Sequence, residues 1–222
     1  MILYHGSSEI VQKPVFGQGK TYNDYGLGFY CTEHMELAKE WACRERKTGF
    51  VSGYELDMGN LKILNLSDPE YSILHWLTIL LENRRIRLST PVMKRGFEWL
   101  KLYYSVEIDE YDVITGYRAD DSYFAFARAF VNNEISLEQL SMAMRLGKLG
   151  EQWMVKSRKA FDAVRFQGYT VVPNIVYYGK RKQRDEQARR EYQKLLEREE
   201  KEGSYIRDLM KKGDMIGHER SI

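Results

Sequence analysis

Three short segments carry side chains that could form a ligand site. His5 precedes Gly6 at an expected strand end, beside a backbone that a ligand can approach closely, although a lone histidine there is usually only a polar turn residue. Tyr30 follows two glycines and is either a core aromatic or the floor of a pocket for a flat ligand. Glu151 and Gln152 are neighbours on an expected strand, so they face opposite sides and only one can point into a given cleft.

An acidic pair and an arginine follow the strand expected at 111–116. Asp120 and Asp121 either cap the N-terminus of the next helix, where negative charge is favoured, or place one carboxylate in the cleft to orient an acceptor or supply an acid. Arg118 could hold a pyrophosphate through two hydrogen bonds, although an exposed arginine is usually only solvated. No group of His and Cys residues has the spacing of metal ligands, so we expect no metal.

Taken in order, these segments resemble the His-Tyr-Glu class of the ADP-ribosyltransferase superfamily, which includes diphtheria-toxin-like enzymes and poly(ADP-ribose) polymerases. The chain is most similar to a bacterial and phage domain-of-unknown-function family within that superfamily. Each motif is weak alone, but four in the right order are fairly specific. They are Leu3–Ser7, Asp24–Thr32 followed by Ala38 and Trp41, Tyr111–Asp121, and Gln152 with Ser157 and Ala160.

The resemblance implies a fold, a substrate and roles for individual residues. It implies an ADP-ribosyltransferase-like split β-sheet core with surrounding helices, and NAD as the substrate. His5 would bind the adenosine-side ribose, the Gly6 backbone would hold the nicotinamide amide, and Tyr30 would stack on the nicotinamide ring. The acid of the third motif normally binds the ribose 2′-hydroxyl and stabilises the positive charge that develops beside it. Further expected NAD contacts are Ser7, Asn23, Arg118 and Asp120.

The third motif departs from the family pattern, because Gln152 stands where an acid is expected. An amide can hold a hydroxyl but can neither act as a base nor offset positive charge. If Gln152 faces the cleft, as we expect, hydrolysis should be slow and the acceptor should need little deprotonation, as a phosphate, a thiolate or a nucleobase nitrogen does. If a bulge instead turns Glu151 inward, ordinary chemistry is restored. The catalytic candidates are Gln152, Glu151, Tyr30 and His5.

These residues need a framework of short strands and helices to bring them together. Apolar segments predict strands at 2–5, 51–56, 61–66, 111–116 and 152–155, with alternating faces in the second and third, and the glycine-hinged turn at 25–32 enters a further strand. Helical spacing predicts helices at 72–82 and 123–131, a helix opened by the capping box of Ser136 and Gln139, and a helix capped by Thr32. Strands separated by helices without a regular repeat indicate an α+β fold.

The chain divides into a body at 1–178 and a charged tail at 179–222. Lys180 begins a charge-dense segment with one apolar stripe, which predicts an amphipathic helix broken or capped at Gly203. The favoured interpretation is a helix that packs along the body by a narrow face. A partner-binding or RNA-contacting helix is the alternative, although its mixed charges weaken the nucleic-acid version.

The bulk properties bear on the compartment. A net charge of +2 predicts no overall attraction to nucleic acid or to membranes. Two cysteines, Cys31 and Cys43, do not make a secreted disulfide framework, and the N-terminus lacks the apolar region of a signal peptide. The apolar run Ile73–Leu81 is too short to span a membrane. These features favour a cytoplasmic protein.

Two classes of function therefore remain. The first is an NAD-dependent mono-ADP-ribosyltransferase that modifies an intracellular macromolecule, protein or nucleic acid, as a toxin or phage-conflict effector; a partner or antitoxin protein could neutralise it. The second is a catalytically weak or inactive module of the same fold, which binds NAD or another nucleotide and acts through protein or RNA contacts. The amide at position 152 is the best argument for the second class.

Overall fold

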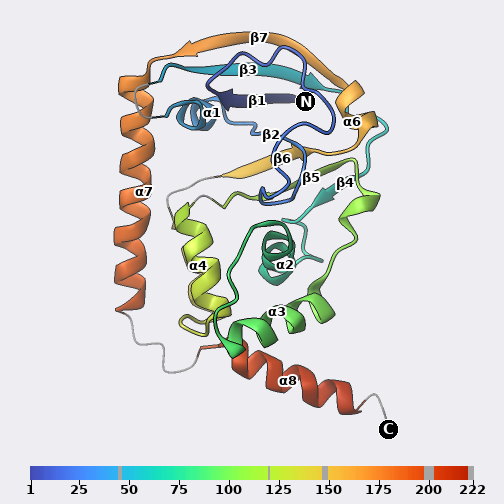
Figure 1. The fold of residues 1–222 in the computed structure, drawn as a ribbon, viewed down its shortest axis with the longest axis vertical. Helices are drawn as coiled ribbons and strands as arrows, with labels where there is room; N and C mark the ends of the chain where they lie inside the picture. Colours follow the sequence, from blue (N-terminus) through green and yellow to red (C-terminus); the bar gives the residue numbers. More distant parts are fainter. Residues whose placement is uncertain (45–46, 120, 147–149, 198–202, 220–222) are drawn as a thin grey trace.

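Two β-sheets, one of three strands and one of four, occupy one half of the structure, and most of the helices lie beyond the second sheet (Figure 1). The computed structural model describes residues 1–44, 47–119, 121–146, 150–197 and 203–219. Within these residues the fold is α+β, as the sequence predicts, with eight α-helices and one short 3₁₀ turn.

The first sheet is antiparallel, and its strands lie in the order β1-β3-β7. A β-bulge at Gly53 and Tyr54 shifts the register between β3 and β7. This sheet lies at one end of the molecule, with β7 outermost (Figure 1). Its strands are β1 (Ile2–Ser7), β3 (Gly49–Leu56) and β7 (Val164–Val172).

The second sheet has the order β2-β6-β5-β4, and only β4 and β5 are parallel. Successive side chains of a strand point to opposite faces. Ile114 and Met154 therefore face the helical core, whereas Val113 and Val155 belong to a cluster shared with the first sheet. Its strands are β2 (Phe29–Cys31), β4 (Ile63–Asn65), β5 (Val113–Tyr117) and β6 (Glu151–Val155).

The two sheets touch through a short backbone bridge and then separate. The N–H of Tyr4 donates to the carbonyl of Thr32 at 2.8 Å, and the N–H of Thr32 donates back to Tyr4 at 2.9 Å. Past this bridge no further backbone pair joins β1 and β2 in the described structure, and residues of both strands line an open space. This separation sets the position of the candidate site.

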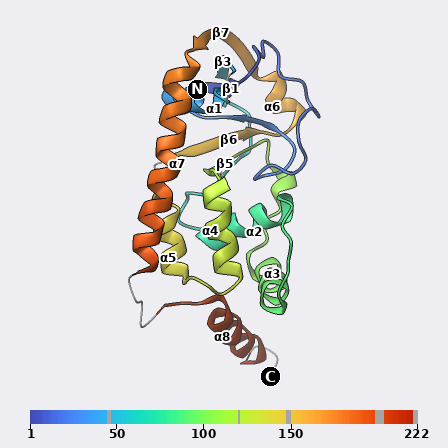
Figure 2. The ribbon, with the colours of Figure 1, turned by 60° about the vertical axis from the view of Figure 1, so that its left-hand side comes forward.

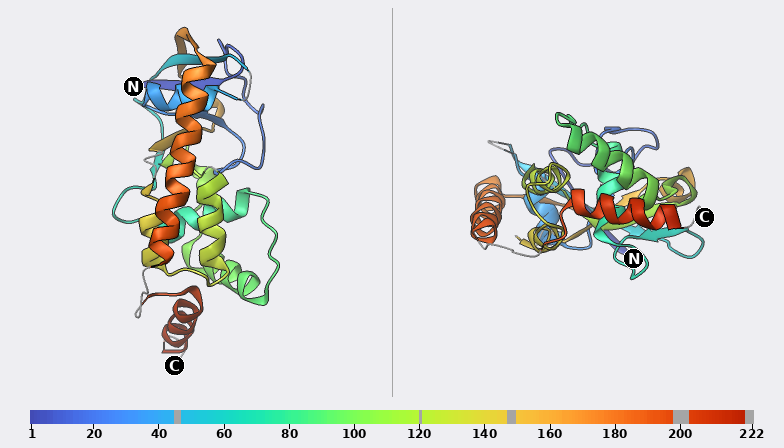
Figure 3. Two further views of the ribbon diagram at one scale, coloured as in Figure 1. Left: turned by 90° about the vertical axis from the view of Figure 1, so that its left-hand side faces the viewer. Right: turned by 90° about the horizontal axis from the view of Figure 1, so that it is seen from below.

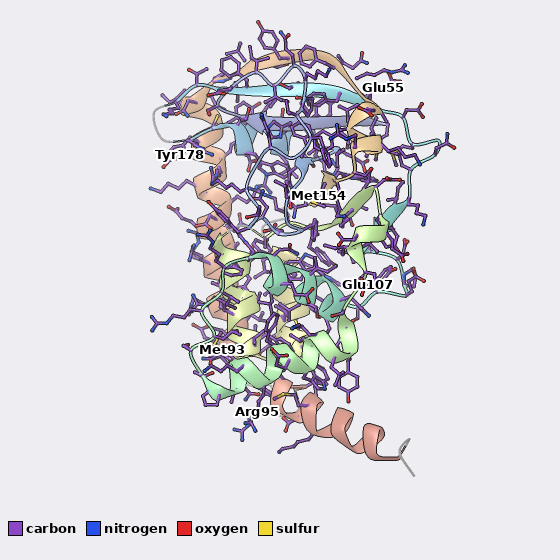
Figure 4. All side chains as sticks on the ribbon, turned by 45° about the vertical axis from the view of Figure 1, so that its right-hand side comes forward. Glu55, Met93, Arg95, Glu107, Met154 and Tyr178 are labelled. Carbon is purple, nitrogen blue, oxygen red and sulfur yellow. The ribbon has the colours of Figure 1, made fainter. Side chains whose placement is uncertain are left out.

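The main hydrophobic core lies between the second sheet and four helices. Its largest fully buried side chain is Trp76, and Figure 4 shows Met154 at its sheet end and Met93 among the helices. The helices begin at good caps, since Ser72 accepts from Leu74 N–H, and Thr90, followed by Pro91, accepts from Met93 N–H. The four are α2 (Ile73–Asn83), α3 (Pro91–Tyr104), α4 (Asp121–Val131) and α5 (Leu137–Ala143).

Helix α1 (Met35–Ala42) packs on the first sheet at very short range. A Cβ at Gly6 would lie 1.9 Å from the Ala38 carbonyl oxygen, and one at Gly49 would lie 2.7 Å from that of Ala42. Only glycine allows this approach. The predicted helix cap at Thr32 is wrong by two residues: Thr32 is held in the bridge to β1, and His34 occupies the cap position.

Two helices follow the sheets. Helix α7 (Asn174–Leu196) runs from the end of β7 along the side of the molecule, past α1 and down to α4 and α5 (Figures 2 and 3). The expected boundary at 178/179 therefore falls inside α7. Helix α8 (Ile206–Glu219) packs against α3 and extends away from the body (Figure 1). Among the described helices, none is long and apolar enough to cross a membrane.

Candidate functional site

A cleft of about 560 Å³ opens where the two sheets separate. Residues from all three predicted segments line it, although up to 147 positions separate them in the sequence. The predicted site residues at its wall are His5, Gly6, Ser7, Asn23, Tyr30, Arg118 and Gln152. Asp120 lies outside the described residues.

His5 links the two sheets at the edge of the cleft. Its Nδ1 lies 2.7 Å from the carbonyl oxygen of Tyr30, and its ring packs 4.5 Å from that of Phe29. A carbonyl can only accept, so Nδ1 carries the proton and Nε2 of the neutral ring is an acceptor. Burial lowers the pKa of His5, against the smaller opposite effect of the bond to Tyr30. The cleft therefore contains a neutral imidazole whose Nε2 can accept from a hydroxyl.

Tyr30 presents its ring while its hydroxyl is engaged elsewhere. The hydroxyl donates to the carbonyl of Gly26 at 2.7 Å and accepts from the N–H of Tyr25 at 3.1 Å. Burial raises the pKa of Tyr30 far above its ordinary value, so this residue is not an acid or a base at neutral pH. What it offers a ligand is an aromatic surface of fixed orientation.

The Gly6 backbone is placed at the cleft by alternation along β1. Tyr4 directs both its N–H and its carbonyl to Thr32, and residues two apart in a strand direct their backbone groups the same way. Gly6 thus faces the side where the sheets part. The sequence predicts that a ligand can approach the Gly6 backbone closely, which is one reason for a glycine there. The structure adds a stronger reason, since α1 leaves no room for a Cβ.

Glu151 and Gln152 lie on opposite faces of β6. Gln152 lines the cleft and is 4% exposed, whereas the Oε1 of Glu151 accepts from the Ser67 hydroxyl at 2.5 Å on the other face. The β5–β6 register runs regularly from Val113–Val155 to Tyr117–Glu151. No bulge in that ladder turns Glu151 inward.

Asp24, the first residue of the second motif, supplies a carboxylate in contact with Gln152, a role that the sequence did not predict. Its Oδ2 accepts from Gln152 Nε2 and from Ala119 N–H, both at 2.8 Å, and Arg84 Nε lies 3.2 Å from its Oδ1. Asp24 is buried and lines the cleft. Burial raises its pKa, against Arg84, the Ala119 N–H and Gln152. The two N–H donors and the ion pair with Arg84 favour the ionised carboxylate, whereas burial, the largest effect, opposes it.

A single backbone carbonyl completes this network behind the cleft. The Tyr117 carbonyl accepts from the Tyr25 hydroxyl at 2.5 Å, from Trp76 Nε1 at 3.0 Å and from Gln152 Nε2 at 3.3 Å. Gln152 Nε2 therefore faces two acceptors, Tyr117 and Asp24. An amide in this position must direct its nitrogen to them, and Oε1 is left as its remaining hydrogen-bonding atom.

Cationic side chains line another part of the wall. The Arg118 guanidinium lies 4.2 Å from the centroid of the Trp41 ring, a cation–π contact. Arg44 and Lys20 line the same cleft, and the only carboxylate among the described lining residues is Asp24, which is paired with Arg84. This excess of positive charge suits an anionic ligand such as a pyrophosphate.

Ser7 and Asn23 line the cleft but also hold the loop between β1 and β2. The Ser7 hydroxyl donates to the carbonyl of Glu9 at 2.5 Å, and Asn23 Nδ2 donates to the carbonyl of Lys20 at 3.1 Å. The loop is anchored on β3, where the Tyr54 hydroxyl donates to the carbonyl of Val11. Several cleft residues therefore come from a loop without regular structure.

Other motif residues shape the frame. The Asp112 carboxylate accepts from Lys62 N–H at 2.9 Å and from the Ser157 hydroxyl at 2.5 Å. Ser157 also caps α6 (Arg158–Asp162), in which Ala160 is fully buried. These residues join the end of the second sheet to α6, outside the cleft.

Comparison with known proteins identifies the family. The family described as "Protein of unknown function (DUF3990)" matches residues 1–166, so the chain belongs to that family. The match contains every residue that lines the cleft, while α7 and α8 lie outside it. No curated protein and no solved structure matches the chain.

Proposed function

We propose that this member of the DUF3990 family is an NAD-dependent mono-ADP-ribosyltransferase with an ADP-ribosyltransferase-like fold. The observation that carries the proposal is the convergence of His5, Tyr30 and Gln152 on one cleft between two separating sheets. The resemblance assigned these three positions to a common NAD site.

The cleft has the size and the groups that a dinucleotide needs. Its volume of about 560 Å³ lies within the usual range for ligand pockets. Tyr30 offers a ring for the nicotinamide, His5 Nε2 an acceptor for a ribose hydroxyl, and Gln152 Oε1 another. Arg118 offers positive charge for the pyrophosphate.

The proposed reaction replaces one bond at the ribose C1′. The bond from C1′ to the nicotinamide nitrogen breaks, and nicotinamide leaves with the electron pair. An acceptor nucleophile then forms the new bond to C1′ with its own electron pair, and an acceptor that carries a proton on the attacking atom releases it to solvent. The positive charge on the ribose in between is the state that the site has to stabilise.

The acceptor follows from the lack of a base at the proposed nicotinamide end of the described cleft, since the neutral imidazole of His5 is assigned to the adenosine-side ribose. Gln152 cannot take a proton, Tyr30 stays protonated and Asp24 is occupied by donors. We therefore expect an acceptor that is already nucleophilic at neutral pH: a phosphate, a thiolate or a nucleobase nitrogen on an intracellular protein or nucleic acid.

The second candidate function is an NAD- or nucleotide-binding module without turnover. It is favoured by one observation, the amide of Gln152 at the position where the resemblance expects an acid. Such a module would act through its surface, and it would bind NAD without releasing nicotinamide.

The experiment that separates the two is incubation of the pure protein with labelled NAD, with and without cell lysate. We expect label transfer to a lysate component, and loss of it on the order of 100-fold in Gln152→Ala, the size of effect typical for one transition-state contact. Glu151→Ala, which alters the opposite face of the same strand, is the matched control and should stay near the wild-type rate.

The possible outcomes distinguish the transferase from the binding module. Loss of transfer only in Glu151→Ala would contradict the assignment of Gln152 to the site. Saturable NAD binding without nicotinamide release would favour the module, and the absence of binding as well would reject both functions.

A further inference from the structure

The resemblance expects a carboxylate at position 152, and the amide of Gln152 lacks its negative charge. The structure holds a carboxylate one hydrogen bond behind it, that of Asp24, which comes from the loop before β2. Asp24 and Gln152 are 128 positions apart in the sequence, and both line the cleft.

We propose that Asp24 is the positioning residue for Gln152: its carboxylate holds the amide nitrogen, so that Oε1 is presented to the ribose. This role rests on the proposed transferase function. Without Asp24 the amide could rotate and offer a donor, which cannot accept from a hydroxyl.

The surroundings restrict the pair to one arrangement. Nε2 faces two acceptors, the Asp24 carboxylate at 2.8 Å and the Tyr117 carbonyl at 3.3 Å. Asp24 is itself fixed by Ala119 N–H at 2.8 Å and by Arg84 at 3.2 Å. In its ionised form the Asp24 carboxylate binds Nε2 more strongly than a neutral acceptor does, which leaves Oε1 a better acceptor.

Gln152 and Asp24 together would supply the two functions of the expected acid, a hydrogen bond to the ribose and a negative charge. Gln152 contacts the ligand, and Asp24 acts through it as a charge that no ligand atom has to touch. A merely structural Asp24, which only anchored Ala119 and Arg84, would need no glutamine beside it. The test therefore has to change the amide and the carboxylate separately.

We would measure nicotinamide release and NAD affinity for Asp24→Asn, Gln152→Glu and the double variant Asp24→Asn/Gln152→Glu. For Asp24→Asn we expect kcat to fall on the order of 100-fold, with a smaller change in the Kd for NAD, because the loss belongs to the charged transition state. The matched control is Asp112→Asn, since Asp112 also accepts a backbone N–H and a side-chain donor but lies outside the cleft.

Gln152→Glu keeps the Asp24 anchors and gives a readout that a structural role would not change. Two carboxylates in contact cannot both ionise easily, so one proton is shared between them. The charged and titratable groups around the pair are Arg84, Arg118, Tyr25 and Tyr30. We expect the kcat of Gln152→Glu to rise with pH as the shared proton is lost. The kcat of the double variant should not show this pH dependence, and it should exceed the kcat of Asp24→Asn at least about tenfold.

A further readout does not depend on activity: the ¹⁵N signal of the Gln152 side-chain amide should shift in Asp24→Asn and stay in Asp112→Asn. The inference is overturned if Asp24→Asn turns over NAD like Asp112→Asn, or if the double variant is no better than Asp24→Asn. If the wild-type chain neither binds nor cleaves NAD, the proposed function is rejected, and the role of Asp24 with it. If the wild-type chain cleaves NAD but the Gln152 amide signal is unchanged in Asp24→Asn, the positioning role alone is rejected.

Discussion

The side chains that line the cleft are held by other groups of the protein, some nearby in the sequence and some distant. His5 donates to the Tyr30 carbonyl, the Tyr30 hydroxyl is held by Gly26, and Gln152 is held by Asp24. The orientations are therefore set before a ligand arrives, and binding does not have to order them. In each side chain, one group holds its position and another group remains for a ligand, as the hydroxyl and the ring of Tyr30 do.

Tyr30 allows that separation to be tested. Tyr30→Phe keeps the ring and removes the hydroxyl contacts with Gly26 and Tyr25, whereas Tyr30→Ala removes the ring as well. We expect the Kd for NAD to change less than about threefold in the first variant and to rise at least about tenfold in the second, because the stacking surface is lost. Calorimetric titration measures both, and equal losses in the two variants would show that the hydroxyl, not the ring, is what binding needs.

His5 predicts a dependence of stability on pH. Burial lowers the pKa of His5 in the folded chain, so between the ordinary value of about 6.5 and the lower folded value only the unfolded chain takes up the proton. The free energy of unfolding should therefore fall as pH drops below about 6.5. Urea unfolding between neutral and mildly acidic pH measures this fall.

A variant isolates the contribution of His5, because burial also lowers the pKa of His75. His5→Asn keeps a donor for the Tyr30 carbonyl but does not titrate. Its stability should decline less steeply with acid than that of the wild type. If the two curves were parallel, His5 would not be the group responsible.

At the scale of elements, α1 packs closely on the first sheet and forms part of the cleft wall. Gly6 and Gly49 meet backbone atoms of α1, and the same helix carries Trp41, which lines the cleft. The other wall comes from the second sheet, where β6 turns Gln152 toward Asp24. A change in the packing of α1 would therefore move one wall relative to the other.

Gly6→Ala is expected to destabilise the fold whatever its effect on ligand binding. The added Cβ would lie 1.9 Å from a backbone oxygen of Ala38, so α1 has to shift, and we expect a loss of about 2 kcal/mol or more. Gly53→Ala, also in the first sheet, is the matched control, since its Cβ would meet the Tyr4 ring at an ordinary 3.7 Å. Chemical denaturation compares them, and an unchanged stability of Gly6→Ala would mean that only a ligand requires this glycine.

At the scale of the whole molecule, α7 joins the first sheet to the helical core. Arg184 forms two hydrogen bonds of 2.8 Å with the buried Glu40 of α1, and Tyr192 stacks on Phe126 of α4 at 4.0 Å. The basic residues at the start of the tail also face α1, since Lys180 forms an ion pair with Glu36. These contacts agree with a helix that packs on the body by a narrow face and give little support to an RNA-binding helix.

Removal of residues 179–222 should therefore damage the body as well as the tail. The truncation leaves Glu40 buried without Arg184, which alone is expected to cost roughly 3 kcal/mol. Thermal unfolding of the truncated chain, with Arg184→Ala in the full chain to isolate that pair, measures the effect. Lys182→Ala, which removes only an exposed pair with Glu186, is the control. A truncated chain that unfolds at the wild-type temperature would make the tail a separate unit.

Much of the framework follows from local sequence signals. Apolar segments located five strands to within a few residues, and the capping box of Ser136 and Gln139 is confirmed. Several elements were missed, among them α3, α6, α8 and β7. Helix α3 carries start signals in Thr90 and Pro91 that could have located it, whereas β7 is an edge strand with mostly exposed side chains, whose apolar alternation is confined to its first residues.

What the sequence by itself determined is the set of local elements and the strand alternation that sends Glu151 and Gln152 to opposite faces. These depend on the covalent chain and on neighbouring residues alone. Only the tertiary structure decided which of the two faces the cleft, that Asp24 is the carboxylate beside Gln152, and that Gly6 is required by α1. Contacts between segments more than a hundred positions apart depend on how the sheets and helices pack, and no local pattern records that packing.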